Sequence, residues 1–168
     1  MKMTYWKAGI FFLVGFLIQT SLLNLISIVG HTPNLLLCLV IVFSFLFEED
    51  LFGLVYGAIF GLLYDMCMST VVGPTAISLA LVAVLILILR EYANIENIIN
   101  MLLTAALSVA VYSAVDWLLR KIAGSTVGFI YMVKTMPISW IYSMAVVTVL
   151  YLILIRKVET HRKDRYFR

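Results

Sequence analysis

The sequence is dominated by six long apolar segments, separated by short polar connections. A helix needs about 20 apolar residues to cross a bilayer, and backbone polar groups in lipid must be satisfied within helices or closed barrels. The segments therefore predict a bundle of about six transmembrane helices. The shortest segment, Asn34–Phe47, could be tilted, re-entrant or enclosed within the bundle. The expected spans are Trp6–Val29, Asn34–Phe47, Leu51–Met68, about Thr75–Leu89, about Ile98–Leu119 and about Tyr131–Ile155.

Composition supports lipid as the surrounding solvent. Of the 168 residues, 64% are hydrophobic and only 12% are charged. A soluble domain carries about 25% charged residues, and a small globule has too much surface to hide the difference by burial. Because there is no long linker and no clear repeat, we expect residues 1–168 to form a single integral membrane domain of the all-α class.

The basic residues predict the orientation of the segments. Six crossings place both termini on one side. With the termini in the cytoplasm, nine Lys and Arg residues lie inside, six of them in a short basic tail from about residue 156, and three lie outside. This distribution obeys the positive-inside rule. The three outer residues, Arg120, Lys121 and Lys134, oppose it and therefore need a local anionic partner.

The third segment carries a stripe of glycines that ends in an acid. Gly53, Gly57, Gly61 and Asp65 are spaced by four residues, so they share one helical face. Small residues at this spacing let two membrane helices approach closely. The stripe therefore predicts a helix-packing or partner interface. The spacing leaves open whether an internal helix or another subunit, as in a homodimer, fills it.

Two intramembrane acids are the sharpest candidates for a functional site. In this topology Asp65 and Asp116 lie at the level of the outer basic residues. An ionised carboxylate in lipid is costly without a partner, and Arg120 follows Asp116 by four residues on the same face. We expect Asp65 or Asp116 to pair with Arg120, Lys121 or Lys134 between the third, fifth and sixth segments. The alternative is that each side chain reaches the interface and is hydrated there.

Catalytic motifs are missing from the sequence. There is no Ser-His-Asp set, no HExxH and no phosphate-binding glycine loop. Cys38 and Cys67 lack CxxC or histidine neighbours, which favours a packing role. A proton relay through Asp65 alone has little support. We therefore expect no enzyme activity, no metal or other cofactor, and no nucleic-acid partner.

Seven residues between positions 33 and 73 form a recognisable pattern around the glycine stripe: Pro33, Asn34, Gly53, Gly57, Gly61, Asp65 and Gly73. With the length, the hydropathy and the basic tail, this pattern resembles the MreD family of bacterial rod shape-determining membrane proteins. Two features depart from that family: the acidic turn Glu48-Glu49-Asp50 replaces an often basic one, and Pro74 stands where an aliphatic residue is more typical.

The resemblance implies a non-enzymatic scaffold in the bacterial plasma membrane. Such a protein binds MreC, a bitopic protein, and acts indirectly with MreB, RodA and a class B penicillin-binding protein in lateral peptidoglycan synthesis. The resemblance also implies a fold similar to the S components of energy-coupling-factor transporters. That similarity supplies the alternative function, a small-molecule-binding subunit of a vitamin-type transporter. It would need an outer cavity, for which the candidate lining residues are Tyr64, Tyr112, Trp117, Tyr131 and Trp140.

Overall fold

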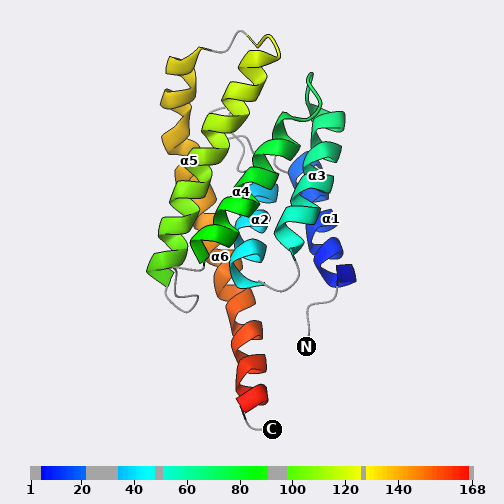
Figure 1. Ribbon diagram of the computed structural model, residues 1–168, viewed down its shortest axis with the longest axis vertical. Coiled ribbons are helices and arrows are strands. Elements are labelled where there is room, and N and C mark those ends of the chain that lie inside the picture. The colour runs from blue at the N-terminus through cyan, green and yellow to red at the C-terminus, as the bar shows by residue number, and fades with distance from the viewer. Residues whose placement is uncertain (1–4, 22–33, 48–50, 91–97, 126–127, 167–168) are drawn as a thin grey trace.

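The computed structural model describes residues 5–21, 34–47, 51–90, 98–125 and 128–166, and within α6 it places only some of the side chains. All regular structure in these residues is helical, which confirms the all-α class. The helices run alternately up and down, so α1 begins and α6 ends at the same end of the bundle (Figure 1). Their bounds are Tyr5–Ser21 for α1, Leu35–Leu46 for α2, Phe52–Met68 for α3, Pro74–Arg90 for α4, Ile98–Ile122 for α5 and Phe129–Tyr166 for α6.

The short helix α2 lies at the centre of the bundle. It contacts each of the other five helices, and every residue from Leu36 to Leu46 is buried. Its sequence, LLLCLVIVFSFL, is apolar all round, which is typical of a helix enclosed by others. Of the three arrangements left open for the segment Asn34–Phe47, the structure therefore shows enclosure within the bundle.

The remaining helices surround α2 and turn apolar side chains outward. Exposed apolar residues occur on every one of these outer helices, among them Ile10, Ile59, Leu81, Leu103 and Ile153. By length and composition, α5 is the one helix in the described ranges that is long and apolar enough to cross a membrane. The shorter apolar helical stretches are Leu35–Leu46, Phe52–Met68, Pro74–Arg90 and Trp140–Ile155. A six-span bundle therefore stays a prediction.

Helix α6 is longer than the sequence predicted. The expected span is about Tyr131–Ile155, whereas α6 runs from Phe129 to Tyr166, a total of 38 residues. Residues 156–166 contain neither glycine nor proline, so nothing in the chain stops the helix where the apolar stretch ends. The basic tail is helical as a result, and Figure 1 shows it extending beyond the other helices. Pro137 lies inside α6.

Candidate functional site

The glycine stripe of α3 packs against α2. A Cβ atom added to Gly57 would lie 2.8 Å from a methyl carbon of Val40, closer than real Cβ contacts come. A Cβ atom on Gly53 would collide with the Ser44 hydroxyl. Both glycines are buried. The first half of the glycine stripe, Gly53 and Gly57, is therefore covered by the central helix of the same chain.

The third glycine brings α3 against the beginning of α4. A Cβ atom on Gly61 would lie 2.8 Å from the Cα atom of Ala76, which is backbone that a side-chain rotation cannot move aside. This close approach places the first turn of α4 beside the carboxyl end of α3. Asp65, one turn after Gly61, is thereby carried to the α3–α4 turn.

Asp65 caps the amino end of α4. Its side chain has an exposed fraction of 0%, and its Oδ2 atom accepts hydrogen bonds from the backbone N–H groups of Gly73 (3.0 Å) and Thr75 (2.8 Å). Pro74 is the first residue of α4, where proline is well tolerated because it lacks an N–H group. The carboxylate therefore satisfies two N–H groups that the helix leaves free, and it meets the positive end of the helix dipole.

Gly73 has a structural reason to be glycine. Its φ angle is +117°, a region that side-chain-bearing residues rarely adopt. This conformation turns the chain from α3 into α4 and directs the Gly73 N–H group at Asp65. The motif residues Gly61, Asp65 and Gly73 thus belong to one local arrangement.

Arg120 joins α5 to this turn. Its Nε atom donates to Asp116 Oδ2 at 2.8 Å, within α5. Its Nη1 atom donates to the Ser69 hydroxyl at 2.8 Å, and its Nη2 atom donates to the Thr75 hydroxyl at 3.0 Å. The same Nη2 atom lies 3.8 Å from Asp65 Oδ1, which makes an ion pair without a hydrogen bond. One guanidinium thus connects α3, α4 and α5.

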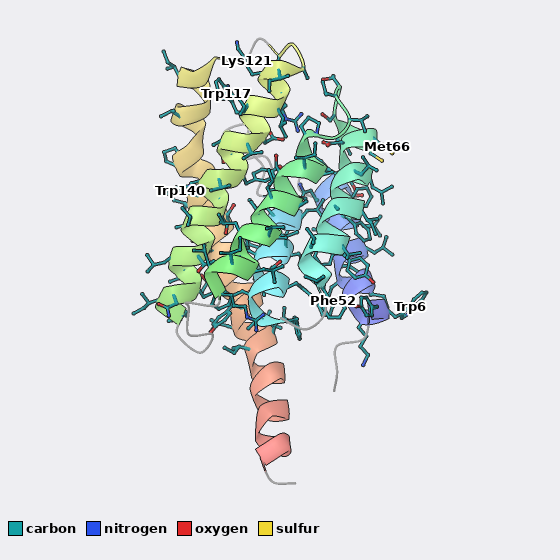
Figure 2. The ribbon with its side chains drawn as sticks, viewed as in Figure 1. Trp6, Phe52, Met66, Trp117, Lys121 and Trp140 are labelled. Atoms are coloured by element: carbon teal, nitrogen blue, oxygen red, sulfur yellow. The ribbon has the colours of Figure 1, made fainter. Side chains whose placement is uncertain are left out.

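The acids and cations of the predicted layer are brought together in part. Asp65, Asp116 and Arg120 form one cluster, in which the Oδ1 atom of each acid is buried without a hydrogen-bond partner. Lys121 is exposed at the same end of the bundle (Figure 2). Lys134 lies in α6, but its side chain is outside the described residues, as is Pro33.

The amino end of α2 has a comparable cap. The Asn34 side-chain oxygen accepts from the Leu37 backbone N–H at 3.0 Å. Gln19, on α1, accepts from the Leu36 N–H at 3.0 Å, and its amide group lies 3.4 Å from the same Asn34 oxygen. Gln19 is a polar residue in an apolar segment, and its side chain joins α1 to the start of α2. The motif residue Asn34 therefore fixes the start of the central helix.

Three polar contributors were not predicted as site residues. Ser69 and Thr75 hold Arg120 through hydroxyl groups, and the only signal for them was their place beside the α3–α4 turn. Arg90, one of the nine basic residues that the predicted topology places on the inner side, is buried, and its Nη1 atom donates to the Ser44 carbonyl at 3.3 Å. Arg90 therefore supports the carboxyl end of α2, where carbonyl groups lack helical donors.

These features define an all-helical bundle whose buried charges tie helices together. The model of the family described as rod shape-determining protein MreD matches residues 1–158. The chain therefore belongs to the MreD family, a membrane protein family with a role in rod shape determination, and the resemblance seen in the sequence is confirmed. No curated protein and no solved structure matches the chain. Similarity to the S components of energy-coupling-factor transporters stays a prediction.

Proposed function

We propose that this chain is a multi-pass protein of the bacterial plasma membrane with both termini in the cytoplasm. The helices α1, α3 and α4 each contain 17 described residues, which reaches the lower end of the range of about 17–25 that spans a bilayer. Their outward faces are apolar. A hydrocarbon solvent accounts for this surface, whereas water does not.

Within that membrane the chain acts as a non-enzymatic scaffold. The family match over residues 1–158 carries this proposal. The cluster around Arg120 supports it, because Asp65 and Arg120 both bind groups of the chain itself. A carboxylate that caps a helix and has an exposed fraction of 0% is in a poor position to meet a substrate. The charges therefore serve the architecture of the bundle.

The partner of the scaffold is MreC, and the complex helps to direct lateral peptidoglycan synthesis. MreB, RodA and a class B penicillin-binding protein act with it indirectly. A bitopic partner of this kind meets a small bundle mainly within the membrane, because four of the five connections between the described helices are five to seven residues long. The apolar outer helices supply the contact area that such a partner needs.

Co-purification tests the proposal against the transporter alternative. We expect an affinity-tagged chain, expressed with MreC and solubilised in mild detergent, to retain MreC in a complex of fixed stoichiometry. An unrelated multi-pass protein with the same tag is the control and should retain none. Mass spectrometry of bound small molecules is the second measurement. A tightly retained vitamin-like ligand, together with an associated ATPase module, would overturn the scaffold in favour of the transport subunit.

A further inference from the structure

One face of α6 changes from exposed to buried along the helix. Val133, Trp140, Val147 and Leu154 are spaced by seven residues, so they lie close to a single line on the helix surface. Their exposed fractions are 46%, 36%, 0% and 2%. Ile130 and Pro137 are also exposed, next to the first two of these residues. We call Ile130, Val133, Pro137 and Trp140 the exposed α6 face.

The change in burial occurs where α2 begins. The Cys38 thiol of α2 donates to the Ser143 carbonyl of α6 at 3.7 Å, and the two helices run in the same direction (Figure 1). Three residues before Cys38 is Leu35, where α2 begins, and three residues before Ser143 is Trp140 on α6. Val147 and Leu154 pack inside the bundle. The exposed α6 face extends the same line of residues past the amino end of α2.

Two properties of the exposed α6 face fit lipid poorly. Along the long axis of the bundle, Trp140 lies at a level between Phe52 and Trp117 (Figure 2), although tryptophan favours the headgroup level of a membrane. Pro137 has no N–H group, so the Val133 carbonyl lacks the donor that an α-helix supplies four residues later. A lipid chain offers no hydrogen-bond partner for the indole N–H or for this carbonyl.

We propose that the exposed α6 face binds one transmembrane helix of the bitopic partner. The face has the seven-residue spacing of a helix-packing seam and is continuous with the interface between α6 and α2, so a helix is the occupant that extends the existing packing. The partner helix presents a small residue to Trp140 and a hydroxyl group to the Val133 carbonyl. This inference rests on the proposed scaffold function and adds the surface that carries it.

Photocrosslinking tests the surface. A benzophenone amino acid is placed at Trp140 or at Val133 in the full chain, which is co-expressed with MreC in bacterial membranes and irradiated. The matched control position is Val14, which is also exposed but lies on α1, a helix without contact to α6 among the described residues. We expect crosslinks to MreC from both α6 positions and at least about tenfold fewer from Val14.

The outcomes separate this inference from the proposed function. MreC that co-purifies but crosslinks from Val14, and not from Trp140 or Val133, overturns the surface and leaves the scaffold intact. Crosslinks between two copies of the chain, or to lipid alone, overturn it equally. MreC that fails to co-purify at all contradicts the scaffold itself. As a second measure, Trp140→Ala should reduce the amount of retained MreC at least about tenfold. Val14→Ala should leave that amount unchanged. Both variants should keep the wild-type melting temperature.

Discussion

At the scale of single residues, Asp65 illustrates how an acid buried in an apolar bundle becomes structural. The carboxylate has an exposed fraction of 0%, yet one oxygen accepts two backbone N–H groups and the other lies within ion-pair distance of Arg120. Charge-assisted hydrogen bonds of this kind are stronger than neutral ones. The acid therefore stabilises the turn that begins α4, and its loss leaves the donors of that helix without partners.

Replacing Asp65 should reveal this capping role. Asp65→Ala removes the acceptor for the Gly73 and Thr75 N–H groups, and we expect it to lower the free energy of unfolding by about 1–3 kcal/mol. Asp65→Asn keeps one oxygen acceptor and should lose less. The melting temperature in detergent measures both. Equal melting temperatures for Asp65→Ala and the wild type would contradict the cap.

The link between Asp65 and Arg120 can be isolated with a double-mutant cycle. We expect Asp65→Asn and Arg120→Gln together to cost less stability than the sum of the single changes, because the attraction between the two residues is already gone after the first change and cannot be lost again. The distance of 3.8 Å and the 31% exposed fraction of Arg120 favour a small coupling energy, about 0.5–1 kcal/mol. Strict additivity in chemical or thermal unfolding argues against the pairing.

At the scale of the helices, the glycine stripe sets how closely α2, α3 and α4 pack. Gly57→Leu puts a large side chain where a Cβ atom alone would lie 2.8 Å from Val40, so we expect α3 to separate from α2 and the bundle to lose about 1–3 kcal/mol or more. Insertion should persist, because leucine favours the membrane. Gly128→Leu is the matched control, since apart from Gly128 and its two chain neighbours no residue comes within 4 Å of a Cβ there.

Size-exclusion profiles and resistance to alkaline extraction measure these two effects separately. A Gly57→Leu chain that remains in the membrane but aggregates in mild detergent has the expected behaviour. A sharp, wild-type profile for Gly57→Leu contradicts close packing. If Gly128→Leu aggregates as well, the damage comes from added leucine and not from the groove.

The sequence was sufficient to predict the helices but not all of their contacts. Apolar runs and glycine spacing are visible in the letters of the sequence, so the segments and the stripe could be found. The main partners of Asp65 are backbone N–H groups of Gly73 and Thr75, and backbone groups have no residue-specific signal. The enclosed position of α2 depends on which helices surround it, which hydropathy does not encode.

At the scale of the whole molecule, the arrangement of the helices agrees with a chain that crosses the membrane an even number of times. Helix α1 begins and α6 ends at one end (Figure 1), whereas the α3–α4 turn and the carboxyl end of α5 lie at the other. The cluster around Arg120 belongs to that second end. The positive-inside rule assigns the basic continuation of α6 to the cytoplasm, so the Arg120 end is expected to face outward.

Cysteine labelling in intact cells tests this orientation. The native thiols are first removed by Cys38→Ala and Cys67→Ser, because Cys67 is exposed and would react. Ala123→Cys, exposed beyond the end of α5, should react with a membrane-impermeant maleimide in intact cells. Thr160→Cys, in the part of α6 that extends past the bundle, should react only after permeabilisation. Thr160→Cys labelled in intact cells, with Ala123→Cys protected, would reverse the orientation. Protection of neither or both positions would contradict a membrane crossing by α6, because α6 alone separates the two residues along the chain and they lie at opposite ends of the bundle.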